Sequence, residues 1–310
     1  MKRCPITYEL IGDNDAYSIR GLRCLSPQLK HLAVLGLSAD EQRQEAISRA
    51  GKMSIQGVQT KLSAQLKIKE GCFKIVDEQG HYILKTQSAH YLELPENEAI
   101  TMTLAETVGI EIPVHGLLYA KDNSMTYFIK RFDRIGPNKK AAVEDFAQLS
   151  ERRRDTKYNS SMEQVIEVVS KFCTFPKIEF IKLLKWSLFN FLVGNEDMHL
   201  KNFSLITKNQ KIYLSPAYDL LNTSIVMPNP KEEIALPLKG KKNNLTKKDF
   251  LSYLAVERLG LNQAIIEDVV KDFLVAIPTW FQLIDNSFLS SGMKEKYKNL
   301  LEMRKRQLFV

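Results

Sequence analysis

The segment "FLVGNEDMHLKNFSLI", residues 191–206, places a dense group of polar side chains between two apolar stretches. The polar residues are Asn195, Glu196, Asp197, His199, Lys201 and Asn202. Polar groups between two buried segments must be solvated, paired with one another or used in catalysis. Asp197 and Asn202 offer a specific chemistry, because a carboxylate can accept the proton of an attacking hydroxyl while a nearby amide oxygen holds a magnesium ion. A short loop lets both side chains face one reaction centre.

The spacing from Asp197 to Asn202 is that of H-R-D-x-x-x-x-N, the catalytic loop of protein kinases. A second metal-binding carboxylate is expected after a strand, a turn and another strand, and Asp219 in "LSPAYDLL" holds that place. The sequence contains no DFG, so the match is one of arrangement. Both aspartates also have simpler explanations, Asp197 as a helix cap and Asp219 as a turn residue.

Phosphoryl transfer from a triphosphate also requires cations and backbone amides near the phosphates. Lys85 ends the segment "HYILK", as the phosphate-binding lysine of kinases ends a strand, and Glu98 in the following helix can pair with it. The phosphate-covering loop is expected in "KMSIQGVQTKLS", residues 52–63, which holds one glycine, Gly57. Two residues have simpler explanations. Lys85 can be the exposed end of a strand, and Ser54, in the expected loop, can be a turn residue between a helix and a strand. With a single glycine, the loop is a weak signal on its own. Its assignment is supported by the order of the motifs along the chain, which is loop, lysine, glutamate, Asp/Asn pair and metal-binding aspartate.

The first half of the chain is rich in strand signals. Residues 1–50 begin irregularly and turn helical over 38–51, where Ser38 is a suitable cap. A hairpin is expected over 72–85 with a turn near Gln79-Gly80, and a second hairpin over 116–132. Residues 58–68 alternate between apolar and polar as a strand does, and a helix is expected over residues 94–110 between the hairpins.

The second half reads as mostly helical. Helices are expected over residues 162–172, 175–194, 246–261 and 262–277, with one β segment over 203–221. The expected fold class is α+β with the bilobal layout of protein kinases, a small β-rich N-lobe followed by a larger helical C-lobe. The expected divisions are an N-terminal segment, an N-lobe and a C-lobe, at residues 1–51, 52–135 and 136–310.

Composition sets the broad class of the chain. Its 310 residues are 44% hydrophobic and 26% charged, which is typical of a globular protein. No run of 18 apolar residues exists and the start lacks the apolar core of a secretory signal, so a cytoplasmic location is expected. Four cysteines without a CxxC pair argue against zinc or a disulfide framework. The net charge of +8 is concentrated at residues 150–158, 239–249 and 303–307, which are either solvated faces or contacts for an acidic partner or nucleic acid.

The ordered motifs resemble the HipA family of serine/threonine kinases, the toxins of bacterial toxin–antitoxin systems. The likeness runs from Ser54 to beyond residue 240. Its blocks are "SIQGVQTKLS", "YILK", "FIKRFDR", "VEDFAQL", "GNEDMHLKNFSL" and "LSPAYDLL", of which the last two together are highly specific. The compact HipT branch is the nearest match. The resemblance implies a kinase fold without the extra N-terminal subdomain of longer HipA proteins, because only 53 residues precede Ser54.

The resemblance also implies roles for individual residues. Asp197 would be the catalytic aspartate, Asn202 and Asp219 the Mg²⁺ ligands, and Lys85 the contact to the ATP phosphates, with Glu98 as its partner. The other implied nucleotide-binding residues are Gly57, Val58, Lys130, Phe132, Gln148 and His199, with the backbone of residues 130–132 at the adenine. His199 can also be a core histidine bonded to backbone.

Ser54 would be the autophosphorylation site of the implied kinase. A phosphate there carries roughly −1.5 to −2 charges. It would lie over a pocket built for the phosphates of ATP, so repulsion or expulsion of the loop would switch the enzyme off.

The resemblance implies partners as well. Family substrates are aminoacyl-tRNA synthetases, and the compact branch is associated with the tryptophanyl enzyme. A small antitoxin similar to the missing N-terminal subdomain would dock near residues 1–51 and the β lobe, with a DNA-binding antitoxin as a third component. Direct contact of this chain with nucleic acid, or with a membrane, is not expected.

Two other classes of function compete with this reading. Small-molecule phosphotransferases of the aminoglycoside or choline-kinase type place a histidine before the aspartate, as H-G-D-x-x-x-x-N, whereas His199 follows Asp197. They also favour acidic pockets, which this basic chain does not suggest. A catalytically silent binding module in a repressor complex is the third reading. The intact set of Lys85, Asp197, Asn202 and Asp219 argues against it.

Overall fold

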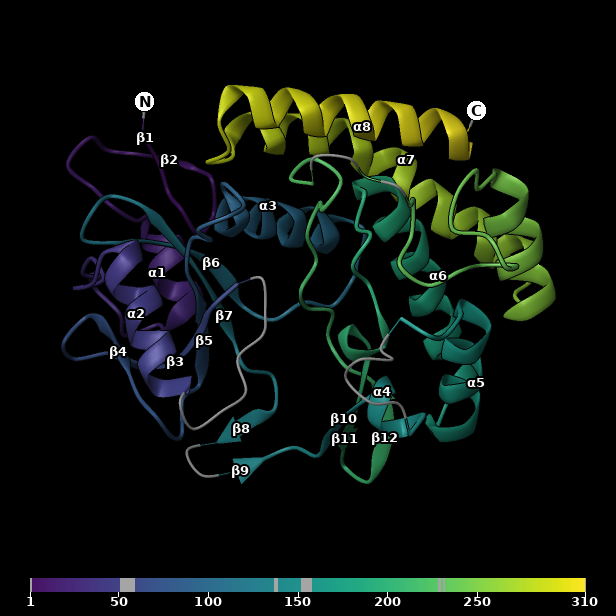
Figure 1. Ribbon diagram of the computed structural model, residues 1–310, viewed down its shortest axis with the longest axis horizontal. Helices are drawn as coiled ribbons and strands as arrows, with labels where there is room; N and C mark the ends of the chain where they lie inside the picture. Colours follow the sequence, from purple (N-terminus) through teal and green to yellow (C-terminus); the bar gives the residue numbers. More distant parts are fainter. Residues whose placement is uncertain are drawn as a thin grey trace. The chain divides into compact units, whose positions relative to one another are not determined.

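The computed structural model describes residues 2–50, 59–136, 139–151, 158–227, 230 and 232–309. The chain forms two compact units, whose elements are labelled in Figure 1. The first comprises Met1–Ile100, Pro113–Lys139 and Asp285–Leu289, and the second Thr101–Ile112, Lys140–Ile284 and Ser290–Val310. The first is rich in strands and the second is mainly helical, which confirms the expected α+β class.

A five-stranded antiparallel sheet with the order β4-β3-β5-β7-β6 is the frame of the first unit. Its strands are β3 (Lys61–Lys67), β4 (Cys72–Ile75), β5 (Tyr82–Lys85), β6 (His115–Tyr119) and β7 (Met125–Lys130). The central strand is β5, where Lys85 is opposite Lys61 of β3 and Tyr127 of β7. The lysine predicted to bind phosphate therefore ends the middle strand of the sheet.

The hairpin expected over residues 72–85 is wrong, because β3 lies between β4 and β5 and pairs with both. Gly80 allows the connection to pass close to β3. A Cβ at this position would lie 1.9 Å from Ser63 Oγ and 3.0 Å from the Ala64 nitrogen. A larger residue would force Ser63 to move and would crowd the backbone of β3, so glycine is favoured there. The second expected hairpin, β6 with β7, is confirmed.

The N-terminal segment packs on the same sheet. It contains β1 (Lys2–Arg3), β2 (Leu10–Ile11), α1 (Ile19–Leu25) and α2 (Ala39–Ala50). Figure 1 shows α1 and α2 beside the strands. Leu22 and Leu25 of α1 and Ala46 of α2 share a buried cluster with Leu84 and Phe128 of the sheet. Residues of the segment 1–51, expected as a separate region, are thus part of the core of the first unit.

Helix boundaries in this half follow the expected cap signals. Ser38 and Glu41 cap the start of α2 reciprocally, since each side chain accepts a hydrogen bond from the other's backbone N–H, at 3.2 and 2.7 Å. Helix α3 (Leu94–Thr107) has Pro95 in its first turn, and Gly109 with φ +72° follows its end.

The short strands β8 (Arg134–Gly136) and β9 (Lys139–Lys140) come later in the chain.

The second unit is built around α6 (Pro176–Val193), which packs against α5 (Met162–Phe172), the π-helix η3 (Lys248–Arg258) and α8 (Ser291–Phe309). The sequence analysis did not predict α8. Helix α7 (Gln263–Asn286) was expected to end at residue 277 but continues past Pro278. The Pro278 side chain is exposed, and Trp280 and Ile284 beyond it are buried, so packing holds the last turns.

A small antiparallel sheet with the order β10-β11-β12 belongs to the second unit. Its strands are β10 (Val143–Asp145), β11 (Ser204–Lys208) and β12 (Lys211–Leu214). The expected β segment over 203–221 supplies β11 and β12, whereas β10 was not predicted. The short helix α4 (Phe146–Leu149) directly follows β10. The short helix η2 (Leu200–Asn202) is separated from the start of β11 by one residue.

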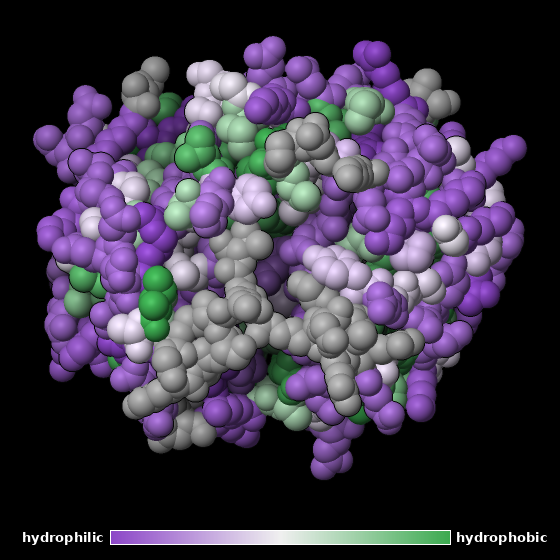
Figure 2. Space-filling view, in the orientation of Figure 1, coloured by the Kyte–Doolittle hydropathy of each residue, from purple (hydrophilic) through white to green (hydrophobic). Residues whose placement is uncertain are grey.

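The face of the molecule drawn in Figure 2 is mainly polar where its residues are described. Within the described residues, none of the helices combines the length and apolar character needed to cross a membrane.

Candidate active site

Lys85 and Glu98 form a buried ion pair in the first unit. The Lys85 Nζ lies 2.5 Å from Glu98 Oε1, and the two side chains are 4% and 3% exposed. The ammonium also lies 5.5 Å from the centre of the Tyr127 ring on the neighbouring strand β7. The structure thus brings together the strand-end lysine and the helix glutamate that the sequence paired. Such a pair holds the lysine in one position, because neither charge can be left alone in the core.

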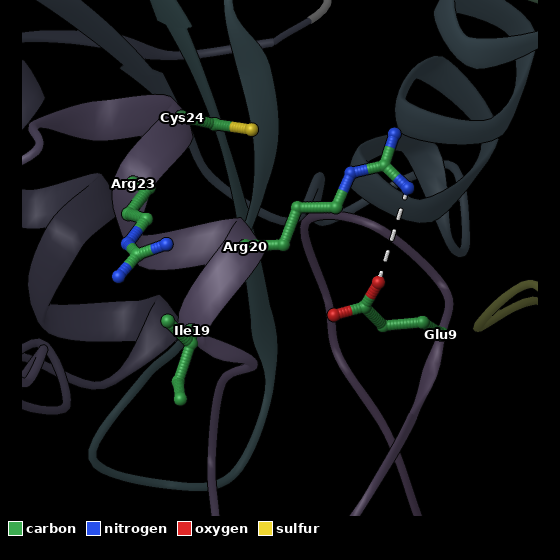
Figure 3. Close-up of a pocket in the computed structure, with 5 residues that line it drawn as sticks. All are labelled: Glu9, Ile19, Arg20, Arg23 and Cys24. Atoms are coloured by element: carbon green, nitrogen blue, oxygen red, sulfur yellow. Dashed lines mark ion pairs between the residues drawn. The ribbon is translucent and has the colours of Figure 1, made fainter.

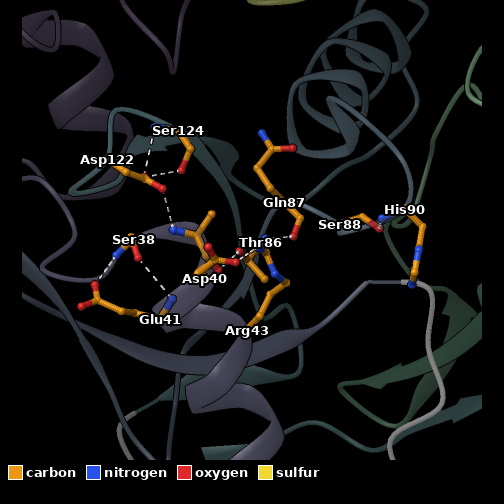
Figure 4. A network of polar contacts seen from close by, with 11 residues as sticks. Ser38, Asp40, Glu41, Arg43, Thr86, Gln87, Ser88, His90, Asp122 and Ser124 are labelled. Atoms are coloured by element: carbon orange, nitrogen blue, oxygen red, sulfur yellow. Dashed lines mark hydrogen bonds and ion pairs between the residues drawn. The ribbon is translucent and has the colours of Figure 1, made fainter.

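A network of polar contacts holds the chain that follows Lys85, as Figure 4 shows. The Thr86 hydroxyl donates to the Ala39 carbonyl at 3.4 Å, and Arg43 donates to the Gln87 carbonyl at 3.1 Å. The Asp122 carboxylate, in the turn between β6 and β7, accepts the Ala39 N–H at 3.0 Å. The start of α2 is therefore tied to the end of β5, and α2 ends at Ala50, just before the predicted phosphate-covering loop.

Three predicted residues of that loop, Ser54, Gly57 and Val58, lie outside the described residues. The predicted adenine-contacting residues follow β7. Lys130 ends this strand with an exposed side chain, and its N–H donates to the Val114 carbonyl at 2.8 Å, while Phe132 is half-buried. Their nucleotide-binding role stays a prediction.

The predicted catalytic loop follows α6 in the second unit. Gly194 ends the helix with φ +69°, a conformation that favours glycine. A Cβ there would lie 2.4 Å from Leu300 Cδ2 of α8 and 2.8 Å from Ser224 Oγ. The turn into the loop is therefore packed tightly from two sides.

A chain of buried amide side chains fixes the backbone of Asp197. The Asp197 N–H donates to Asn195 Oδ1 at 3.1 Å, Asn195 Nδ2 donates to Asn190 Oδ1 at 2.7 Å, and Asn190 Nδ2 donates to the Trp186 carbonyl at 2.8 Å. Asn195 is 1% exposed. Asn190 and Asn195 also line a small, mostly apolar cavity of about 30 Å³. The loop is thus anchored to α6 through side chains that the sequence analysis left without a role.

The two residues of the predicted Asp/Asn pair are joined by a direct hydrogen bond. Asn202 Nδ2 donates to the Asp197 carbonyl at 2.9 Å, and the same carbonyl accepts the His199 N–H at 2.8 Å. The Asp197 side chain is 50% exposed, whereas His199 and Asn202 are buried. His199 Nε2 lies 3.9 Å from Asp197 Oδ1. The loop therefore presents the Asp197 carboxylate to solvent while its neighbours are held in the interior.

Asp219 lies on the segment after β12, with a backbone φ of +55°. This conformation is uncommon for residues other than glycine and recurs at functional sites. The preceding residue connects the segment to the predicted catalytic loop, because the Tyr218 hydroxyl donates to the Lys201 carbonyl at 2.9 Å. The structure thus links the side chain of the residue before Asp219 to the backbone of the residue before Asn202.

Gln148 has a clear structural role at the start of α4. Its side-chain oxygen accepts the Asp145 N–H at 3.1 Å, and its own N–H donates to Asp145 Oδ1 at 2.8 Å. This reciprocal arrangement is a capping box. The predicted contact of Gln148 with the nucleotide stays a prediction.

Tyr158 is the neighbour of Asp197 that the sequence analysis missed. Its hydroxyl donates to Asp197 Oδ1, and its ring meets the His199 ring edge-on, with the centres 5.1 Å apart. Burial, and then the hydrogen bond and charge of Asp197, raise the pKa of Tyr158. The residue belongs to the run "SERRRDTKY", whose sequence signal is its charge, and no local spacing links it to residue 197.

An open pocket elsewhere in the first unit is lined by Glu9, Ile19, Arg20, Arg23 and Cys24 (Figure 3). Arg20 and Glu9 approach each other there to 4.0 Å. None of the predicted nucleotide-binding residues that the structure describes lines this pocket.

The donor atoms that the loop can offer suit a hard cation. The Asn202 amide nitrogen is committed to the Asp197 carbonyl, so its remaining polar atom is an oxygen. Asp219 adds a carboxylate. Oxygen ligands of this kind fit Mg²⁺, which usually takes one or two protein ligands and completes its shell with water and phosphate oxygens. Across the described ranges, no group of three or more His, Cys, Asp or Glu residues is placed to hold a metal ion.

Known proteins share the sequence and the fold of this chain. The HipA-like C-terminal domain family matches residues 53–281. Y4dM, a candidate kinase of Sinorhizobium fredii, is 35% identical over 74% of this chain and 59% of its own length, so the match spans less than two thirds of that protein. A candidate kinase of Haemophilus influenzae is 29% identical over 93% of this chain and 92% of its own length. A chain in the Shewanella oneidensis complex of HipA, HipB and operator DNA has the same fold, with a TM-score of 0.71 and 19% identity over 96% of this chain and 80% of that chain.

Proposed function

Because this chain belongs to the HipA-like C-terminal domain family, we propose that it transfers the γ-phosphoryl group of ATP to a serine or threonine hydroxyl of another protein. The similarity to candidate kinases along most of the chain supports phosphoryl transfer in general. The serine/threonine specificity rests on the resemblance of the "GNEDMHLKNFSL" and "LSPAYDLL" segments to HipA kinases.

The observation that carries the proposal is the exposed carboxylate of Asp197, on a loop whose backbone is held by hydrogen bonds to the buried side chains of Asn195 and Asn202. In the proposed step, the acceptor hydroxyl donates to this carboxylate. As the acceptor oxygen bonds to the γ-phosphorus, the bond from that phosphorus to the bridging oxygen of ADP breaks, and the proton passes to Asp197. Fixing the aspartate in advance lowers the barrier, because little reorganisation remains when the acceptor arrives.

ATP and Mg²⁺ are the proposed cofactors. Asn202 and Asp219 would hold the metal through oxygen atoms, and Lys85, kept in place by Glu98, would contact the phosphates. Bound Mg²⁺ would supply neutralisation of the phosphate charge that develops during transfer. Lys130, Phe132, Gln148 and His199, together with Gly57 and Val58, are proposed to complete the nucleotide site. The ion pair of Lys85 with Glu98 supports the phosphate role, because kinases use such a pair.

The proposed biological role is that of a toxin. The substrate would be an aminoacyl-tRNA synthetase, with the tryptophanyl enzyme first, and phosphorylation of one of its serines would stop tRNA charging in the cytoplasm. Phosphorylation of Ser54 would switch the kinase off through its roughly −1.5 to −2 charges.

Partners are part of the same proposal. The Shewanella oneidensis HipA was solved with HipB and operator DNA, which supports a DNA-binding antitoxin for this chain. A second, small antitoxin is proposed to dock on the first unit near residues 1–51. The DNA contact would be made by the antitoxin.

The test is intact-mass spectrometry of the phosphatase-treated chain after incubation with Mg-ATP and a panel of purified synthetases. Wild type is expected to add phosphoryl groups to itself and to one synthetase. Ser54→Ala is expected to modify the synthetase but not its own loop, and Asp197→Ala to modify neither. A folded wild-type chain that adds no phosphoryl group to any protein would contradict the proposal and favour a small-molecule phosphotransferase or a binding module.

A further inference from the structure

Tyr158 is placed to compete for the catalytic carboxylate. Its hydroxyl donates to Asp197 Oδ1. An ionised carboxylate can only accept hydrogen bonds, and the serine or threonine of a substrate must donate to the same group. A phenol and a seryl hydroxyl are equivalent donors in this respect. The tyrosine therefore offers Asp197 the kind of bond that an acceptor hydroxyl needs.

The contact is not required to hold the loop. The Asp197 backbone is fixed through Asn195 and Asn202, both of which are buried. Tyr158 is instead 39% exposed. A side chain that is partly in solvent can turn away without opening the core, whereas the buried amides cannot. The buried Asn195 and Asn202 therefore position the Asp197 backbone, whereas the partly exposed Tyr158 only forms a hydrogen bond with its carboxylate.

The local chain anchors Tyr158 from its C-terminal side. The Ser160 N–H donates to the Tyr158 carbonyl at 2.9 Å, and Ser161 caps the start of α5, where its hydroxyl accepts the Gln164 N–H at 3.4 Å. Two residues lie between Tyr158 and this cap. The ring rests against His199, whose side chain is buried. The tyrosine is thus held near Asp197 by a short connection to a stable helix end, so its effective concentration at the carboxylate is high.

We infer that Tyr158 is an intramolecular cap on Asp197, which occupies the position of the acceptor hydroxyl and must be displaced before a protein substrate can react. This inference rests on the proposed phosphoryl transfer. The cap lowers the apparent affinity for the protein acceptor, because acceptor and phenol compete for one carboxylate. It leaves ATP affinity unchanged. Hydrogen bonds to charged groups are strong enough for the competition to matter by about tenfold.

The test compares Tyr158→Phe with wild type in phosphoryl transfer from γ-labelled Mg-ATP to dephosphorylated casein and to the chain itself. Tyr158→Phe keeps the ring and its contact with His199 but loses the donor. We expect the KM for casein to fall about tenfold, with an unchanged KM for ATP, and self-phosphorylation to accelerate. Tyr158→Leu should behave in the same way. The matched control is Tyr213→Phe, which removes a hydroxyl from β12 and is expected to behave as wild type.

Four outcomes distinguish the alternatives. A lower kcat of Tyr158→Phe would show that the phenol positions Asp197. Kinetics equal to wild type would show that the phenol neither positions Asp197 nor competes with the acceptor. Either result overturns the cap and leaves the kinase proposal standing. If wild type and both Tyr158 variants are as inactive as Asp197→Ala, the proposed function fails, and the cap with it. Activity that appears only when Tyr158 is replaced would support both.

Discussion

The two compact units hold the charges that we propose to be functional in opposite ways. In the first, Lys85 and Glu98 neutralise each other, and both side chains are almost fully buried. In the second, the Asp197 carboxylate is 50% exposed, and only its backbone is held from within by Asn195 and Asn202.

The difference follows from what each charge is proposed to do. A lysine that contacts phosphate must keep one position, and a buried partner of opposite charge secures it. An aspartate that receives a proton must stay accessible and unpaired by any permanent cation. Removing a charge from the first unit should therefore reduce stability, whereas removing the Asp197 charge should reduce activity alone.

The largest stability effect should come from Lys85→Met, which leaves the Glu98 carboxylate buried without its lysine. We expect a loss of about 3–5 kcal/mol in the free energy of unfolding, measured by urea denaturation. The double variant with Glu98→Met should recover most of this loss while remaining inactive. A single variant as stable as wild type would show that the pair does not hold the first unit together.

The next effect concerns pH, through Glu96 in the first turn of α3. Burial raises the pKa of Glu96 to about 7, although Gln87 Nε2 donates to both of its oxygens at 2.8 and 2.9 Å. A raised folded-state pKa stabilises the fold below the unfolded value of 4.5, and this contribution is lost as the pH rises through about 7. The shift corresponds to about 3 kcal/mol.

Urea denaturation between about pH 4.5 and pH 8 measures this contribution. Glu96→Gln should remove most of the decline in stability with rising pH. Glu106→Gln, an exposed position on the same helix, serves as the control and should keep the decline. Equal pH profiles for all three proteins would refute the role of Glu96.

A smaller effect on stability is expected in the second unit for Asn195→Ala. The substitution leaves the Asp197 N–H and Asn190 Oδ1 without their partner, at a cost of about 1–3 kcal/mol. Because Asp197 would no longer be held in place, kcat should fall about ten- to hundredfold while the KM for ATP stays constant. The exposed Asn299→Ala on α8 is the control. An unchanged kcat would show that the amide chain is only structural.

The smallest effect should come from the start of α2. Ser38→Ala removes the hydroxyl that accepts the Glu41 N–H and should cost about 1 kcal/mol in urea denaturation. Ser48→Ala, in the last turn of the same helix, should not destabilise the protein. If the two substitutions cost the same, the cap does not set the stability of this helix.

The sequence predicted best what depends on local spacing. The Asp/Asn loop is a five-residue relation, and the strand-end lysine and helix glutamate follow from periodicity and cap signals. Strand neighbours are a different matter, because alternation shows which residues face the core but not which strand lies beside which. The pairing of β3 with both β4 and β5 was therefore missed.

Two other features escaped for separate reasons. Helix α8 is rich in charged residues. Its buried face is a narrow row of Tyr297, Leu301, Arg304 and Leu308, whose helical spacing was the available signal. Tyr158 and Asp197 are 39 residues apart, so only the folded chain brings them together. Contacts of that range cannot be read from local patterns.

The central claim is that Asp197 performs the chemistry without holding the fold. The most direct measurement is the single-turnover rate of phosphoryl transfer from Mg-ATP for Asp197→Asn, beside urea denaturation of the same protein. The exposed Asp268→Asn on α7 is the matched control. We predict a rate loss of about 10²–10⁴-fold with unfolding free energy close to wild type. A folded Asp197→Asn protein that transfers phosphate at the wild-type rate would contradict the account.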